Sequence, residues 1–305
     1  MTSTKENAIN PPLWKLWLLT ARPKVLTQSI TPVLAAALLA YNSVKEIQWG
    51  LAFVALISAL LIQIGSHFIN DALDYKKGAD TKTRLGPIRP LQMGLLSFHH
   101  VYVGGLACLL LALIVGIPLM VAGGYPVAIA LFVSASMAYF YTGGPFPLAY
   151  TGLSDLFVFL FYGLCCTISV YYALTLQVDP TVILLGSQLG LLSMIMLIVV
   201  NLRDVLDDTK AVKRTLAVRF GPFFSRSQLT LALIAPFVLN LMWWFYGYHL
   251  SALLPFLTLP LAVKLLIDVW THEPGPVYNK FMVVAGLLNL SFALLLCAGL
   301  FLNVF

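Results

Sequence analysis

Long apolar blocks alternate with short polar segments along most of the chain. Each block approaches the ~20 residues that an α-helix needs to cross the hydrocarbon core of a bilayer. The blocks predict nine membrane-spanning helices: Val25–Tyr41, Trp49–Ile69, Val101–Ala122, Pro126–Tyr141, Leu153–Leu174, Thr181–Val200, Leu229–Tyr246, Leu250–Trp270 and Phe281–Phe301. We therefore expect an all-α polytopic membrane protein with one transmembrane domain at residues 25–305, preceded by a short segment at residues 1–24.

Composition supports this interpretation. Apolar residues make up 60% of the 305 residues and charged residues only 10%, whereas about a quarter of the residues in soluble domains are charged. The four cysteines all lie inside apolar blocks, so we predict that they pack in the core and form neither a disulfide framework nor a zinc site.

The basic residues are distributed unequally between the two sides of the predicted bundle. Nine spans put the N-terminus and every even-numbered loop on one side, and that side holds all 18 lysines and arginines except Lys45. Because cytoplasmic loops are enriched in basic residues, residues 1–24 are predicted to be cytoplasmic and the C-terminus to lie outside. This bias accounts for the net charge of +6, which therefore does not indicate a nucleic-acid partner.

Six of the twelve carboxylates gather in two short segments. The first follows the second span and contains Asn70, Asp71, Asp74 and Asp80; the second follows the sixth span and contains Asn201, Arg203, Asp204, Asp207 and Asp208. Four spans separate the two segments, so both are expected at the cytoplasmic face. Charged groups are costly inside a membrane domain, and matched aspartates at two span ends therefore indicate a functional site.

The spacing of the aspartates predicts their chemistry. In a helix that continues through each segment, Asp71 shares a face with Asp74, and Asp204 shares a face with Asp208, whereas Asp207 is turned away. Two facing carboxylate pairs repel each other unless a cation neutralises them. Mg²⁺ is typically held by one or two carboxylates together with substrate phosphates. These four aspartates are therefore predicted to be catalytic and to bind Mg²⁺ and a diphosphate.

Basic residues accompany both aspartate segments. Arginine binds phosphate through a planar fork and lysine as a point charge, so these side chains are candidates for diphosphate binding: Lys76, Arg84, Arg89, Arg203 and Lys213. The general excess of cytoplasmic basic residues explains most of them individually, but it does not explain the clustered aspartates.

Several motifs resemble the UbiA superfamily of intramembrane prenyltransferases, and in particular its 1,4-dihydroxy-2-naphthoate branch. The matching segments are Asn70-Asp71-x-x-Asp74-x-x-x-Gly78-x-Asp80, Arg84–Arg89, Tyr141–Leu148, Gly152–Phe161, Asn201-x-Arg203-Asp204-x-x-x-Asp208 and Lys213–Gly221. Two positions depart from the branch: Val200 stands where an asparagine is usual, and Val212 where a glycine is usual.

The resemblance implies a nine-helix fold in the cell (inner) membrane, with a cavity that opens to membrane lipid and an active site at the cytoplasmic face. It also implies Mg²⁺-dependent transfer of a polyprenyl group from polyprenyl diphosphate to 1,4-dihydroxy-2-naphthoate, with loss of CO₂ and formation of demethylmenaquinone. The residues expected to bind the substrates are Asn70, Lys76, Asp80, Arg84, Arg89, Tyr141, Asp155, Asn201, Arg203 and Lys213.

Other interpretations stay open at this point. A related enzyme that prenylates another aromatic acceptor, such as 4-hydroxybenzoate, would carry similar aspartate motifs. A secondary transporter is disfavoured, because such proteins usually have inverted repeats and ionisable residues near the membrane midplane. Asp155 either stabilises a helix N-terminus electrostatically or lines the acceptor site. Arg22 either anchors the chain at the lipid headgroups or contacts substrate.

Overall fold

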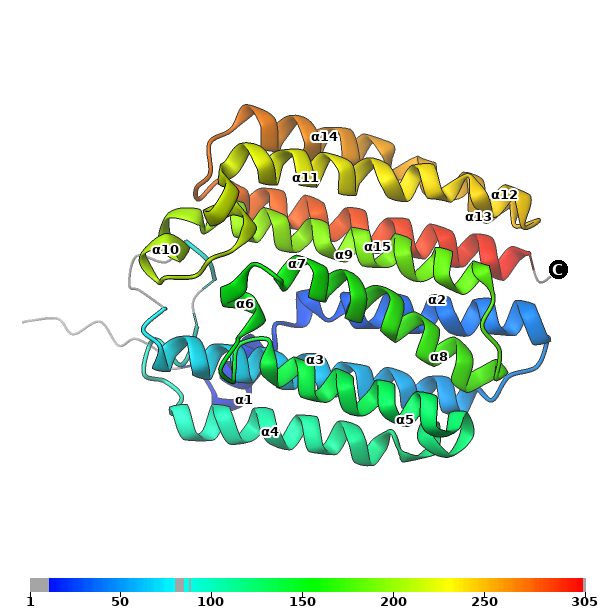
Figure 1. The fold of residues 1–305 in the computed structure, drawn as a ribbon, viewed down its shortest axis with the longest axis horizontal. Helices are drawn as coiled ribbons and strands as arrows, with labels where there is room; N and C mark the ends of the chain where they lie inside the picture. The colour runs from blue at the N-terminus through cyan, green and yellow to red at the C-terminus, as the bar shows by residue number, and fades with distance from the viewer. Residues whose placement is uncertain (1–10, 80–84, 88, 304–305) are drawn as a thin grey trace, which may run out of the picture.

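The computed structural model describes residues 11–79, 85–87 and 89–303, which form a bundle of helices with no β-strand among them (Figure 1). The α-helices are α1 Leu13–Ala21, α2 Thr27–Val44, α3 Trp49–Lys76, α4 Phe98–Val115, α5 Ile117–Phe140, α6 Leu148–Thr151, α7 Ser154–Val158, α8 Cys166–Thr175, α9 Pro180–Arg203, α10 Val205–Lys210, α11 Leu216–Asn240, α12 Met242–Phe245, α13 His249–Leu253, α14 Leu259–Thr271 and α15 Tyr278–Leu302. A π-helix, Phe159–Cys165, joins α7 to α8.

The described helices confirm the membrane prediction. Eight spans are long and apolar enough to cross a bilayer, and a ninth is obtained if the bent pair Leu13–Val25 and Thr27–Val44, which meet at 52°, counts as one. Large apolar side chains cover the outside of the bundle, as expected of a surface that faces lipid; examples are Leu110, Val121, Leu231 and Val283.

The boundary between the third and fourth predicted spans is wrong. α4 ends at Val115 rather than at Ala122, and the following helix contains a break at Gly124, where φ is 62° and ψ is −154°. The prediction failed because apolar residues continue through the turn, so that hydropathy alone could not mark it.

α9 is the central helix of the bundle. Within its apolar window 72% of the residues are buried, and none of the other seven unbent candidate spans exceeds 44%. Small residues allow this close packing: a Cβ on Gly163 of the π-helix would lie 2.5 Å from both the Gly186 carbonyl oxygen and the Gly190 Cα. The C-terminal end of α9, which begins the second aspartate segment, is therefore held in place by the core of the protein.

A neutral polar network that includes Trp243 of α12 joins α9, α11 and α13 in the part of the bundle far from the aspartates. The Trp243 indole N–H donates to the Gln188 side-chain oxygen at 2.7 Å, and the Gln188 amide donates to Asn240 Oδ1 at 3.1 Å. Asn240 in turn donates to the Ala252 carbonyl oxygen at 2.8 Å. A buried network with these polar atoms hydrogen-bonded stabilises the packing of the three helices.

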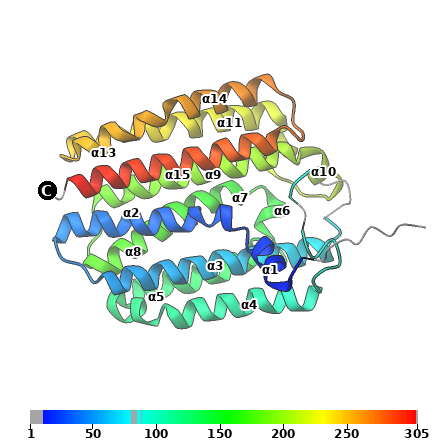
Figure 2. The same ribbon diagram turned by 180° about the vertical axis from the view of Figure 1, so that it is seen from behind.

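Both aspartate segments lie at the same end of the bundle, as the sequence predicts. Figure 1 and the reverse view in Figure 2 show α1, α6 and α10 at this end, and the C-terminus at the opposite end. α1 packs against α3 there, with the Trp17 and Phe68 rings 5.2 Å apart. The predicted division between residues 24 and 25 thus falls in the connection between α1 and α2. The cytoplasmic location of residues 1–24 stays a prediction.

Candidate functional site

The first aspartate segment lies on an unbroken helix. α3 continues to Lys76, so Asp71 and Asp74 share one face, as the spacing predicts. Both side chains are buried, and each residue is only 1% exposed. A buried carboxylate is strongly unfavourable unless cations and hydrogen-bond donors compensate its charge.

Residues from distant parts of the chain compensate Asp74. Its Oδ2 atom lies 3.1 Å from Lys213 Nζ and 3.2 Å from Arg89 Nη1, and its Oδ1 atom accepts a hydrogen bond from the Tyr150 hydroxyl at 2.8 Å. These partners lie in three different connections between the long helices: α3 to α4, α5 to α7 and α10 to α11. The charge of Asp74 therefore depends on the tertiary structure of this end of the bundle.

Asp71 is compensated by two arginines. It forms an ion pair with Arg22, and its Oδ1 atom lies 3.2 Å from Arg89 Nε. Arg22 adopts a left-handed backbone conformation, with φ 55°, at the end of α1, and this turn directs the chain from α1 towards α2. Arg22 therefore contacts a residue of the predicted metal site, in addition to any contact with lipid headgroups.

Polar contacts connect the first segment to the loop after α5. Asn70 Nδ2 donates to Thr142 Oγ1 at 2.9 Å, and Asn70 Oδ1 accepts from Arg89 Nη2 at 3.2 Å. Lys77 Nζ donates to the Thr142 carbonyl oxygen at 2.7 Å. Burial lowers the pKa of Lys77, while the negative charge of Asp74 opposes this shift and the positive charge of Lys213 adds to it.

The second segment is not the continuous helix that we expected. α9 ends at Arg203, Asp204 occupies a non-helical joint with φ −93° and ψ 7°, and α10 begins at Val205. The Asp208 N–H still donates to the Asp204 carbonyl oxygen at 2.8 Å. One turn therefore separates Asp204 from Asp208 despite the joint.

Asp204 and Asp207 of the second segment are compensated by residues next to them in the chain. The buried Arg203 guanidinium donates to both carboxylate oxygens of Asp204 at 2.7 Å, which is the strong two-pronged geometry of arginine and a carboxylate. Asp207 forms an ion pair with Lys210 at 3.8 Å. That Asp207 faces away from Asp204 and Asp208 stays a prediction.

Two residues connect the second segment to the first. The Lys213 main-chain N–H donates to the Asp208 carbonyl oxygen at 2.9 Å, while Lys213 Nζ contacts Asp74. Asn279 of α15 accepts from Arg203 Nη1 at 2.8 Å and donates to the Leu85 carbonyl oxygen at 2.9 Å. The structure thus brings both aspartate segments and their loops together.

The remaining candidates are placed differently. Lys76 is exposed and lies 5.8 Å from the Phe98 ring centroid. Asn201 is buried, and the Tyr141 ring packs against Phe157 with 5.2 Å between their centroids. Asp155 is 2% exposed, and among the described residues neither of its carboxylate oxygens has a hydrogen-bond partner of good geometry. Asp80 and Arg84 lie outside the described residues.

Three contact residues were missed by the sequence interpretation. Tyr150 lies between the segments Tyr141–Leu148 and Gly152–Phe161, both of which resemble the family. Its position between them was a weak indication that it belongs to the site. Thr142 lies inside a matched segment, but nothing in its type distinguished it. Asn279 follows a proline-rich loop, and no feature of the sequence singled it out.

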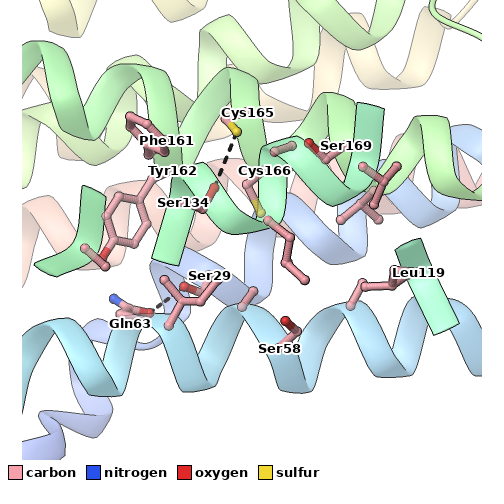
Figure 3. A pocket seen from close by; sticks show the side chains of 18 of the residues that line it. Ser29, Ser58, Gln63, Leu119, Ser134, Phe161, Tyr162, Cys165, Cys166 and Ser169 are labelled. Atoms are coloured by element: carbon pink, nitrogen blue, oxygen red, sulfur yellow. Dashed lines mark hydrogen bonds between the residues drawn. The ribbon is translucent and has the colours of Figure 1, made fainter. Parts of the chain in front are cut away.

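An apolar cavity lies among α2, α3, α5 and the π-helix (Figure 3). About 810 Å³ of space is free of atoms there, including the part open to the outside. Its polar lining includes Ser29, whose hydroxyl donates to Gln63 at 2.6 Å. On α3 the lining residues Gln63 and Ser66 are followed at helical spacing by Asn70, so the lining face of α3 leads towards the aspartates.

The donor set fits a magnesium–diphosphate complex. Among the described residues no three His, Cys, Asp or Glu side chains lie close enough to hold a metal ion by themselves. Mg²⁺ does not require such a cage, because it retains water and takes phosphate oxygens as ligands. Two aspartate pairs with cationic side chains between them supply the hard oxygen ligands and the phosphate partners that such a complex needs.

Comparison with known proteins gives consistent matches. Residues 29–287 match the profile of the UbiA prenyltransferase family. A 1,4-dihydroxy-2-naphthoate octaprenyltransferase from Haemophilus influenzae is 32% identical, over 93% of this chain and 96% of that protein. The enzyme of the same name from Mycobacterium tuberculosis is 33% identical, over 74% of this chain and 78% of that protein. The one from Escherichia coli is 29% identical, over 94% of this chain and 95% of that protein.

Solved structures share the fold at low sequence identity. The apo structure of a UbiA homologue from Aeropyrum pernix superposes with a TM-score of 0.69 at 15% identity, over 93% of this chain and 98% of that one. A UbiA homologue from Archaeoglobus fulgidus, bound to DMAPP and Mg²⁺, gives 0.59 at 17% identity, over 92% and 98%.

Proposed function

The chain belongs to the UbiA prenyltransferase family, and we propose that it transfers a polyprenyl group from polyprenyl diphosphate to 1,4-dihydroxy-2-naphthoate, with release of diphosphate and CO₂, to give demethylmenaquinol, the reduced form of demethylmenaquinone. The observation that carries this proposal is the match along nearly the whole chain to a 1,4-dihydroxy-2-naphthoate octaprenyltransferase. The arrangement of the two aspartate segments supports the chemistry independently of that name.

The diphosphate is bound at the end of the bundle where the aspartates meet. Asp71, Asp74, Asp204 and Asp208 would hold Mg²⁺, which polarises the leaving diphosphate when it is bound. Arg89 and Lys213 already contact Asp74, and they are placed to exchange part of that contact for phosphate oxygens. The other proposed polar ligands of the substrates are Asn70, Lys76, Asp80, Arg84, Asn201 and Arg203.

The prenyl chain occupies the apolar cavity. The cavity wall that follows α3 leads towards Asn70 and the aspartates, so an allylic carbon next to the diphosphate would lie where the apolar lining meets the charged site. Apolar walls exclude water, and this protects the electron-deficient allylic carbon until the aromatic ring attacks it.

The aromatic acceptor approaches beside Tyr141 and Asp155. Asp155 is a buried carboxylate whose oxygens have no well-formed hydrogen bond among the described residues, and such a group favours a ligand that donates a hydroxyl. Tyr141 contributes an aromatic face next to Phe157. A phenolic ring such as that of a dihydroxynaphthoate satisfies both features.

The site faces the cytoplasm in this proposal. By the order of the spans in the sequence, the loops on the side of the aspartate segments hold nearly all of the basic residues, and basic loops are retained in the cytoplasm. The N-terminus is then cytoplasmic, and the C-terminus lies on the opposite, outer side of the cell (inner) membrane.

The deciding assay offers the purified protein carboxyl-labelled 1,4-dihydroxy-2-naphthoate, 4-hydroxybenzoate and a mixture of prenyl diphosphates, with Mg²⁺. We expect one labelled CO₂ for each prenyl group transferred, and a prenylated naphthoquinone in the mass spectrum of the lipid products. Prenylated 4-hydroxybenzoate that retains its carboxylate, with no label released from the naphthoate, would assign the protein to a different pathway.

A further inference from the structure

Tyr150 makes contacts with both halves of the site although it belongs to neither aspartate segment. It lies on the short helix α6, in the connection between the fourth and fifth spans. The main chain holds it there from two directions: the Ala149 N–H donates to the Tyr141 carbonyl oxygen at 2.8 Å, and the Arg214 N–H donates to the Tyr150 carbonyl oxygen at 3.1 Å. The second bond ties α6 to the loop that follows the second segment.

Gly152 allows this close approach of the two loops. It has φ +79°, which a residue with a side chain rarely adopts, and a Cβ at this position would lie 2.9 Å from the Arg214 carbonyl oxygen. The backbone around Tyr150 is therefore fixed relative to Lys213 by loop packing, and the position of the phenol ring follows from it.

The hydroxyl and the ring of Tyr150 act on different groups. The hydroxyl donates to Asp74 Oδ1 at 2.8 Å. Lys77 Nζ lies 4.3 Å from the centroid of the ring, and Lys213 Nζ lies 5.1 Å from it. Both distances are within the range of cation–π attraction, so one side chain contacts a predicted metal ligand and two cations.

Neither lysine is restrained by the ring alone. Lys77 also donates to the Thr142 carbonyl oxygen at 2.7 Å, and Lys213 also contacts Asp74 at 3.1 Å. These contacts hold the two ammonium groups near the C-terminal end of α3, where Asp74 lies. Lysine side chains without such contacts would sample many rotamers.

We propose that Tyr150 is a positioning residue of the diphosphate site: its ring orients Lys77 and Lys213 as a clamp for the phosphates, and its hydroxyl orients Asp74 as a metal ligand. This inference rests on the proposed function, because it takes the ligand to be a diphosphate with a divalent cation. It adds to the proposed site a residue outside the aspartate segments. The hydroxyl and the ring of Tyr150 make chemically different contributions, so substitutions can test them separately.

The two contributions predict different defects. Tyr150→Phe keeps the ring and removes the bond to Asp74. Loss of such a supporting bond to a metal ligand typically reduces metal affinity or activity by about 10- to 100-fold. Tyr150→Leu also removes the ring, so it is expected to weaken diphosphate binding by a further factor of about 5, from the lost cation–π attraction.

The experiment uses the full-length protein in detergent and two matched control variants. Tyr125 is 87% exposed and lies in the first part of α5, next to the break at Gly124; Figure 1 shows that α5 begins at the end of the bundle away from α6 and α10. Tyr125→Phe and Tyr125→Leu therefore make the same chemical changes away from the site. For every protein we would measure binding of Mn²⁺ with inorganic diphosphate by electron paramagnetic resonance, binding of inorganic diphosphate by calorimetry, and the thermal unfolding temperature.

We expect Tyr150→Phe to lose mainly Mn²⁺ affinity, Tyr150→Leu to lose affinity for both ligands, and the Tyr125 variants to match the wild type, with similar unfolding temperatures throughout. Wild-type ligand affinities in both Tyr150 variants would overturn the inference, and so would equal losses that are accompanied by a lower unfolding temperature. Because these readouts need no aromatic acceptor, wild-type protein that binds diphosphate but does not prenylate the naphthoate contradicts only the proposed function.

Discussion

The two aspartate segments have the same residue pattern but different structural support. In the first, Asp71 and Asp74 lie on one unbroken helix, are almost fully buried, and receive their cations from other loops. In the second, the helix breaks at Asp204, and Arg203 and Lys210 next to the aspartates provide the compensating charge.

The first segment is therefore a tertiary site, stabilised by residues from other parts of the chain, and the second is a local site, stabilised by residues next to it in the chain. The carboxylates of the first segment gain their partners only when Arg22 and Lys213, which are distant in the sequence, and Arg89 of the loop after α3 are in place. In the second, Asp204 and Asp207 are compensated by Arg203 and Lys210 beside them, and the joint at Asp204 leaves α10 attached to α9 by a single non-helical residue. We infer that the first segment is the fixed side of the diphosphate site and that the second adapts to the ligand.

Removal of the metal gives the largest expected effect and tests what the two segments share. If both hold the same magnesium–diphosphate complex, EDTA abolishes turnover, and excess Mg²⁺ or Mn²⁺ restores it. The measurement is prenyl transfer by purified protein before chelation, after chelation and after the metal is added back. Full turnover in EDTA would mean that the aspartates balance the basic residues and bind no metal.

Single substitutions should show that the segments are equivalent in catalysis despite their different support. Asp71→Asn, Asp74→Asn, Asp204→Asn and Asp208→Asn are each expected to lower turnover by about 10³-fold, because each removes a ligand of the cation that stabilises the leaving group by several kcal/mol. Initial rates at saturating substrate provide the measurement, and the amount of folded protein recovered from membranes is the control. Near-normal turnover in the variants of one segment alone would assign the metal to the other.

Removal of a cation should separate the segments by stability. Arg89→Leu removes the cation that the two buried carboxylates share, which leaves Asp71 with Arg22 and Asp74 with Lys213, and it is expected to reduce the free energy of unfolding by about 3 kcal/mol. Lys210→Leu removes an ion pair whose lysine side chain is 70% exposed, and such pairs contribute less than about 1 kcal/mol.

The free energies of unfolding of both variants are measured in mixed micelles by titration with a denaturing detergent. Equal losses in the two variants would contradict the distinction between a tertiary and a local site.

The smallest effect is expected at Asp207. Asp207→Asn should keep turnover within about 3-fold of the wild type, since helical spacing turns this residue away from Asp204 and Asp208 and its ion pair with Lys210 is long. Steady-state rates across a range of Mg²⁺ concentrations provide the test. A loss as large as that of Asp204→Asn would show that the joint at Asp204 rotates α10 and brings Asp207 into the metal site.

The sequence by itself determined that the protein is an all-α membrane protein with eight to nine spans, and it predicted the aspartates of the candidate site. Apolar blocks and helical spacing are properties of consecutive residues, so the shared face of Asp71 and Asp74 followed from their separation alone. The same reasoning failed at Gly116, where the turn is as apolar as the helices around it, and at Asp204, where the backbone leaves the helix although the spacing of the aspartates is helical.

Only the tertiary structure decided which groups neutralise the buried carboxylates. Arg22 is 49 residues from Asp71, and Tyr150 and Lys213 are 76 and 139 residues from Asp74. Several basic residues and tyrosines at the same membrane face had the right chemistry, and no local pattern chose among them. The choice depends on how the loops between the spans pack, because a buried charge is stable only where its partners come within hydrogen-bonding distance.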